Sequence, residues 1–262
     1  MGGRGSKSSG SISASAFQIA SANVVPNATI AQSANNANFS ATDNSPYHNL
    51  YGGRQYFNNQ NLTIDQQLAT MNYLSNTPEA GSLYSMSQNL NHALATGQPL
   101  TANQQYVLDN MEGAMHNLGY NLNLTRYDHA DMVNNLLRAN GVRGDYSKMT
   151  QAQLKQALVG TRYGEERLLS TSYNDFANAP PNSKAVFDTR AVKISYKAPA
   201  ATQAMMPGKG PGGDLGEIVL DRSKGRKNYE VTDVIFTGKS ARAKGTQSYS
   251  LPQVELVVQV YP

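Results

Sequence analysis

The sequence predicts an α+β protein in which helices come first and a β-rich region follows. Residues 1–58 are rich in Ser, Ala, Asn and Gly and show no sustained hydrophobic period. Apolar residues then recur at helical spacing, and beyond residue 118 short strand-like runs alternate with Gly- and Pro-rich turns. We therefore expect a low-complexity, disordered tail (1–58), a helical subdomain (59–118) and a β-rich core (119–262).

The helical subdomain is predicted to contain three helices. The first begins near Leu62, where Thr63 or Asp65 can cap its start and apolar residues follow at helical spacing. The second and third are expected over residues 83–94 and 102–118. The Met and Tyr stripes of these helices are typical of a packed core, so we assign them to packing rather than to a cofactor site.

The core is predicted to begin with a strand over 121–127, a helix over 131–138 that ends at Asn140-Gly141, and a second helix over 151–159. Five strand-like runs follow, at residues 168–173, 191–197, 216–221, 229–236 and 254–261. In the last run apolar and polar residues alternate, so this strand is expected to bury one face and to expose Glu255 and Gln259.

Composition excludes several kinds of site. The chain has 262 residues, and its 22 Lys and Arg exceed its 18 Asp and Glu by a margin that favours anionic ligands but does not indicate specific nucleic-acid binding. It lacks cysteine, which excludes disulfides, thiolate zinc sites and a cysteine nucleophile, and its four histidines show no metal-ligand spacing. We expect no metal. No secretion signal or membrane span is apparent, so we expect a soluble protein without a membrane partner.

One glycine-rich segment matches a nucleotide-binding pattern only superficially. Residues 208–213 read Gly-x-Gly-x-x-Gly, but Pro211 interrupts the segment and a strand, not a helix, is expected after it. The dinucleotide fingerprint needs a strand before the glycines and a helix after them. We interpret the segment as a surface loop that moves over a ligand or recognises a partner.

Three polar features lie at the ends of predicted strands. Arg126 is near the end of the first strand, Ser170-Thr171-Ser172 ends a second, and Glu217 begins a third, directly after the glycine-rich segment. Each alone is typical of an ordinary solvated strand end. Their order along the chain and their surroundings are more specific.

From about Leu100 to Pro262 the sequence resembles the ADP-ribosyltransferase exoenzyme family, the arginine–serine–glutamate class that includes clostridial binary toxins, C3-like exoenzymes and phage-encoded transferases. Five blocks carry this resemblance in order: Leu100-Thr101 through Leu124-Thr125-Arg126-Tyr127, Gly160-Thr161-Arg162-Tyr163 through Leu168-Leu169-Ser170-Thr171-Ser172, Phe187-Asp188-Thr189-Arg190, Ala191-Val192-Lys193-Ile194, and Gly216-Glu217-Ile218-Val219-Leu220-Asp221-Arg222 followed by Tyr229-Glu230-Val231.

The resemblance implies a split β-sandwich that holds NAD, as a substrate, in a cleft of the core, and transfer of ADP-ribose to a protein acceptor without a metal. It implies that Glu217 is the catalytic carboxylate, that Ser170 positions Glu217, and that Arg126 and Arg190 bind the pyrophosphate. This agrees with the chemistry, because cleavage of the nicotinamide–ribose bond creates an oxocarbenium-like cation that a fixed negative charge stabilises, and a guanidinium can engage two phosphate oxygens.

Three further residues of the NAD site follow from the same resemblance. Phe187 is expected to pack on the nicotinamide, and Thr171 and Ser172 are expected to shape the end of the strand beside NAD.

The position that selects the acceptor departs from the family. Arginine-modifying members carry Glu, and C3-like members Gln, two residues before the catalytic Glu, where this sequence has Leu215. Either Asp214 takes that role by a shift of register, or the enzyme modifies something other than arginine, or it mainly hydrolyses NAD. Asp214 and Leu215 are thus the candidate acceptor-recognition residues.

The first residues, Met1 to Gly10, resemble tails of proteins from the head-gene clusters of tailed bacteriophages. We therefore expect a protein of a phage virion or of the bacterial cytoplasm, with a protein substrate that is bacterial. The alternative is a catalytically inactive, virion-associated structural or interaction protein that retains the fold. A secreted toxin would need an export route that the sequence does not show.

Overall fold

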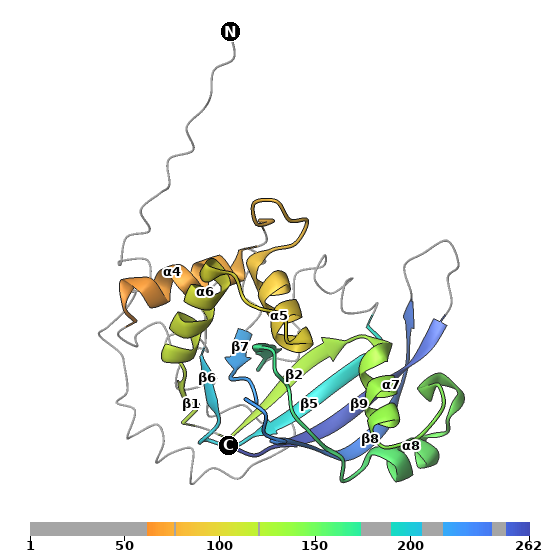
Figure 1. Ribbon diagram of the computed structural model, residues 1–262. Helices are drawn as coiled ribbons and strands as arrows, with labels where there is room; N and C mark the ends of the chain where they lie inside the picture. The colour runs from red at the N-terminus through yellow and green to blue at the C-terminus, as the bar shows by residue number, and fades with distance from the viewer. Residues whose placement is uncertain (1–61, 76, 120, 174–189, 206–216, 243–249) are drawn as a thin grey trace.

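The computed structural model describes six stretches of the chain: residues 62–75, 77–119, 121–173, 190–205, 217–242 and 250–262 (Figure 1). The disorder predicted for residues 1–58 and the glycine-rich segment 208–213 lie outside these stretches. Within them, no helix is long and apolar enough to cross a membrane.

Three helices form a layer at the beginning of the described chain: α4 (Ile64–Leu74), α5 (Met86–Thr96) and α6 (Ala102–Gly113). Thr63, one of the two caps that the sequence offered, caps α4 in a capping box with Gln66, and Thr101 does the same for α6 with Gln104. The apolar faces of the helices pack on one another and bury Leu90 and Met111 completely.

The third helix is shorter than predicted. It ends at Gly113 instead of Leu118, and His116–Asn117 form strand β1, which pairs with β6 (Gln203–Met205). Residues 116–117 therefore form a strand because they pair with a strand almost ninety residues away along the chain. The local helical spacing contains no information about such a distant partner. Neither β1 nor β6 was predicted from the sequence.

The strands form one mixed sheet of nine in the order β1-β6-β7-β4-β2-β5-β9-β8-β3. The remaining strands are β2 (Leu122–Asp128), β3 (Arg162–Tyr163), β4 (Leu169–Ser172), β5 (Val192–Ala198), β7 (Glu217–Leu220), β8 (Tyr229–Arg242) and β9 (Ser250–Val260).

The sheet is divided where β4 meets β2. Strand β2 pairs with β5 along its full length, and β4 pairs with β7 along its full length, but β2 and β4 share the single register pair Thr125–Ser172. The two groups of strands therefore separate on either side of this pair. The predicted fold class, an α+β protein with a helical element followed by a split β-sandwich, is confirmed.

Two groups of helices pack on the sheet. The layer α4–α6 packs on β6, β7 and the residue just before β4 through a cluster that includes Met205, Val219 and Leu168. Helices α7 (Ala130–Ala139) and α8 (Gln151–Leu158), with the short 3-10 helix η3 (Tyr146–Lys148) between them, belong to the larger core, which includes residues of β2, β5, β8 and β9 and also of β4, β6 and β7. Figure 1 shows these two groups of helices at opposite ends of the sheet.

The last strand buries one face, as its alternation predicted, and leaves Val254, Leu256 and Val258 without exposed surface. Glu255 and Gln259 are half-buried rather than exposed. Glu255 accepts a hydrogen bond from Ser195 of the parallel strand β5, and the Gln259 amide donates to the Lys197 carbonyl. The polar residues that were expected to face solvent therefore form hydrogen bonds with the neighbouring strand β5.

Candidate active site

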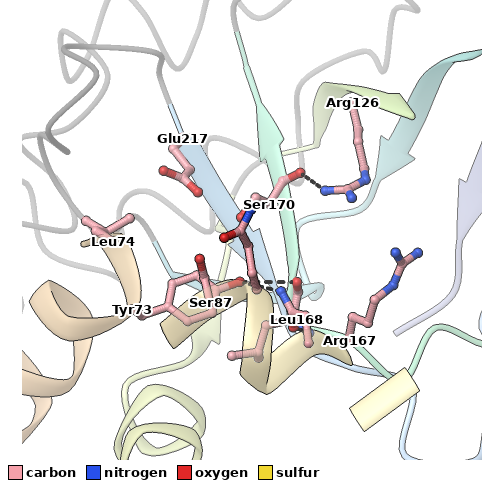
Figure 2. Close-up of a pocket in the computed structure, with 10 residues that line it drawn as sticks. Tyr73, Leu74, Ser87, Arg126, Arg167, Leu168, Ser170 and Glu217 are labelled. Carbon is pink, nitrogen blue, oxygen red and sulfur yellow. Dashed lines mark hydrogen bonds between the residues drawn. The ribbon is translucent and has the colours of Figure 1, made fainter. Parts of the chain in front are cut away.

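A cavity of about 310 Å³ lies between the helical layer and the divided part of the sheet, and its size is within the range of sites that bind small molecules (Figure 2). Its lining consists of Tyr73, Leu74, Ser87, Gln88, Asn91, Arg126, Arg167, Leu168, Ser170 and Glu217. The three predicted catalytic residues, Arg126, Ser170 and Glu217, are thus brought together although they come from three different strands.

Arg126 is held in place by two hydrogen bonds. Its Nε donates to Asp128 Oδ2 at 3.1 Å, and its Nη1 donates to the Ser170 carbonyl oxygen at 2.9 Å, which bridges the gap between β2 and β4. Burial opposes ionisation of Asp128, but Arg126 and the backbone amide of His129 outweigh it and hold the pKa of that carboxyl below its usual value. Asp128 is therefore a fixed anion that orients Arg126.

Ser170 and Glu217 share one face of the β4–β7 pair. Ser172 is the register partner of Glu217, and side chains alternate along a strand, so Ser170, two residues before Ser172, lies diagonally opposite Glu217 on the same face. This face points toward the helical layer, because Leu168 and Val219 pack into its core. Both side chains are half-buried at the cavity wall.

Thr171 and Ser172 support the strands and do not line the cavity. Thr171 is buried and its hydroxyl donates to the Ile218 carbonyl oxygen at 2.7 Å, which ties β4 to β7 next to Glu217. Ser172 has no exposed surface and occupies the one position where β4 meets β2. Their predicted part in shaping the strand end stays a prediction, for which this placement gives a physical basis.

Tyr73 and Asn91 complete one wall and were not singled out from the sequence. The Asn91 side chain accepts from the Leu168 amide at 3.0 Å and donates to the Tyr73 hydroxyl at 3.0 Å, and that hydroxyl donates to the Leu168 carbonyl oxygen at 3.3 Å. Burial raises the pKa of Tyr73 despite the Asn91 hydrogen bond, so the hydroxyl stays protonated.

The Met and Tyr residues of the helices were predicted to pack in a core. This is so for the Tyr73 ring, which belongs to the helical core, but the Tyr73 hydroxyl also faces the cavity. No local signal marks either residue, because their partner Leu168 lies 95 and 77 residues further along the chain.

Two other arginines take different positions. Arg167 lines the cavity and donates from Nε and Nη2 to the two carboxylate oxygens of Glu165, at 2.6 and 2.5 Å. Arg190 does not line this cavity, and its Nη1 lies 2.7 Å from His129 Nδ1. Its predicted contact with pyrophosphate stays a prediction.

Three predicted site residues, Phe187, Asp214 and Leu215, lie outside the described residues. Their expected roles at the nicotinamide and the acceptor stay predictions.

Comparison with solved structures shows which known proteins have a similar fold. No protein-family model and no curated protein matches the chain. Among solved structures, the Clostridium limosum C3 exoenzyme is similar at a TM-score of 0.52 and 17% identity, over 79% of this chain and 89% of that chain.

Two larger toxin components are also similar. The ADP-ribosylating toxin BECa of C. perfringens, solved with NADH, matches at a TM-score of 0.52 and 11% identity, over 77% of this chain. The enzymatic component C2-I of the Clostridium botulinum C2 toxin matches at 0.51 and 13%, over 76% of this chain. This chain spans 44% of the length of each. The described chain therefore has the fold of the ADP-ribosyltransferase exoenzymes, as its sequence motifs indicated.

Proposed function

We propose that the protein is a mono-ADP-ribosyltransferase that binds NAD in this cavity, cleaves the nicotinamide–ribose bond and transfers ADP-ribose to a protein acceptor. The observation that carries the proposal is the charge arrangement of the cavity. Figure 2 shows Glu217 on one side of Ser170, and Arg126 and Arg167 on the other. NAD has the complementary arrangement, with a cationic nicotinamide riboside at one end of an anionic pyrophosphate.

Glu217 acts on the bond that breaks. As the bond between ribose C1′ and the nicotinamide nitrogen lengthens, its electron pair moves into the pyridinium ring, which leaves as neutral nicotinamide, and positive charge develops on the ribose. A carboxylate fixed beside the ribose stabilises that charge more in the transition state than in bound NAD. The acceptor nucleophile then bonds to C1′ and loses a proton, whereas attack by water would give free ADP-ribose.

Ser170 and Arg126 position the reacting groups. Ser170 stands between Glu217 and the arginines, and its backbone carbonyl holds Arg126. Tyr73 closes the wall beneath them with a protonated hydroxyl. The sheet and the helical layer thus hold NAD between charged side chains that are half-buried, which strengthens each electrostatic contact. The solved complex of BECa with NADH supports this choice of ligand.

The test is label transfer from NAD carrying a tagged adenosine into bacterial lysate, with wild type beside Glu217→Gln and Ser170→Ala. Glu217→Gln keeps the size of the side chain and removes its charge, so we expect nicotinamide release and labelling to fall about 10²- to 10³-fold. Glu217-dependent labelling of a discrete band would also deliver the acceptor for mapping.

If wild type releases no nicotinamide and labels no band above the Glu217→Gln background, across several lysates, the protein is not a transferase. The alternative, an inactive structural or interaction protein with this fold, would then stand. The bacterial origin of the acceptor and a place in a phage particle rest on the first ten residues of the sequence, and proteomics of purified particles tests them. Whether Asp214 or Leu215 selects the acceptor follows from the mapped site.

A further inference from the structure

Arg167 belongs to the cavity, yet no part of the sequence motif assigns it a role. Glu165 engages its guanidinium side-on, through Nε and Nη2, and Arg167 keeps 32% of its side chain exposed. The third nitrogen, Nη1, donates to no group among the described residues. Arg167 therefore presents an oriented but unsaturated donor edge to a ligand.

Arg126 is held in a comparable way. Asp128 and the Ser170 carbonyl engage its Nε and Nη1, and its side chain is 23% exposed. Both guanidinium groups act on the same carboxylate, because Arg126 and, more weakly, Arg167 lower the pKa of Asp128. Two cations from β2 and from the chain just before β4 thus flank one end of the cavity, and each is fixed by its own carboxylate.

Taking the proposed function as its basis, we propose that Arg167 is a second pyrophosphate-binding residue and forms, with Arg126, the subsite for the two phosphates of NAD. A pyrophosphate presents oxygens on two adjacent phosphorus atoms, and planar guanidinium groups with fixed edges match such oxygens better than mobile ammonium groups. Because Glu165 and Asp128 orient the arginines before the ligand arrives, little side-chain entropy is lost on binding.

Glu165 is the positioning residue for Arg167. Its carboxylate accepts from the Arg167 backbone amide at 3.1 Å, which fixes the carboxylate beside Arg167, and the Arg167 side chain cannot swing into solvent without breaking its two guanidinium hydrogen bonds to Glu165. Arg190 lacks such an arrangement toward the cavity, since its Nη1 meets His129.

Calorimetric titration of the full chain with ADP-ribose tests the assignment, because this ligand contains the pyrophosphate but not the bond that is cleaved. We expect Arg167→Gln to weaken ADP-ribose binding about 10- to 100-fold and Arg167→Lys to restore only part of the affinity. A loss of one phosphate contact also makes binding less sensitive to salt. Arg222→Gln is the matched control, since Arg222 pairs with Glu112 at similar exposure but does not line the cavity.

Glu165→Gln separates binding from structure. It removes the ion pair but keeps the Arg167 cation, so we expect at most a few-fold loss of ADP-ribose affinity. The assignment is overturned if Arg167→Gln binds ADP-ribose as wild type does, or if Arg167→Gln and Glu165→Gln weaken binding equally and lower the melting temperature equally. If Arg167→Gln does not fold, Arg167→Lys provides the test. An Arg167→Lys variant that binds ADP-ribose with wild-type affinity and wild-type salt dependence would exclude a guanidinium contact between Arg167 and the pyrophosphate.

The result also distinguishes this inference from the proposed function. Wild-type protein that binds neither NAD nor ADP-ribose would overturn both. Wild-type protein that binds ADP-ribose and releases nicotinamide, with an Arg167→Gln variant that does the same equally well, would overturn the assignment of Arg167 alone.

Discussion

At the scale of single residues, the contact between Arg190 and His129 requires a neutral imidazole. A guanidinium only donates, so His129 Nδ1, 2.7 Å from Arg190 Nη1, must accept. Burial and then Arg190 lower the pKa of His129, an effect that Arg126 adds to and that Asp128 and Asp131 oppose. Protonation of His129 would set two cations against each other.

The folded protein should therefore lose stability in acid through His129. The unfolded chain, with an ordinary histidine pKa near 6.5, binds a proton more readily than the folded protein does. The stabilising contribution is complete above that pH and is lost as the pH falls through the lowered folded pKa. His129→Asn keeps an acceptor near the Nδ1 position without titrating. Urea unfolding from pH 7 to pH 5 should show a smaller loss for His129→Asn, and parallel curves would contradict this account.

Tyr73 provides a second prediction at this scale. Tyr73→Phe removes the hydroxyl that joins Asn91 to the Leu168 carbonyl and leaves the half-buried Asn91 amide without this partner, which should cost about 1–2 kcal/mol of unfolding free energy and raise KM for NAD. Tyr106→Phe is the control, because the Tyr106 hydroxyl meets Asp65 at the surface and its loss should stay within about 0.5 kcal/mol. Equal effects of the two substitutions would argue against a role of Tyr73 at the cavity wall.

At the scale of elements, the connection from β3 to β4 depends on a close backbone approach. A Cβ at Gly164 would lie 2.4 Å from the Arg226 carbonyl oxygen, in the turn that follows β7. Gly164→Ala should therefore shift one of these segments and destabilise the protein by about 1–3 kcal/mol.

Gly113→Ala should have the opposite sign. A Cβ there meets only the Gln66 amide nitrogen at 3.4 Å, at the end of α6, and alanine favours the helix over glycine by about 0.5–1 kcal/mol. Chemical denaturation of both variants measures the contrast, and a Gly164→Ala variant as stable as wild type would show that the turn adapts freely.

At the scale of the whole molecule, the helical layer and the sheet share one buried cluster. Leu90 and Met111 of the helices pack with Leu168, Met205 and Val219 of the sheet side. Glu112 of α6 also pairs with Arg222 after β7, although an ion pair at this exposure contributes at most about 1 kcal/mol.

We expect the described elements to unfold as one cooperative unit. Leu90→Ala should cost about 2–5 kcal/mol and should lower NAD affinity as well, because α5 supplies part of the cavity wall. Calorimetry should show a single transition that moves to lower temperature as a whole. A separate low-temperature transition for the helices would mean that the cavity wall forms independently of the sheet.

The sequence by itself determined the fold class, most helix positions and the three motif residues of the candidate site. The helix positions and the last strand depend on local signals, because Thr63 caps its helix and Val254 to Val260 alternate. Such patterns are written into neighbouring residues, so they can be read without knowing what packs against them. The split β-sandwich and the roles of Arg126, Ser170 and Glu217 follow instead from the resemblance of the ordered motif blocks to a known family.

Only the tertiary structure decided which further residues meet at the cavity. Strands β1, β3 and β6 have two or three residues each, too few for a period, and they exist because a partner strand pairs with them. Tyr73, Asn91 and Arg167 reach the site because the helical layer closes over the divided sheet. Their side chains carry no local mark of this role, because contacts between residues 77 or 95 positions apart arise only when the chain is folded.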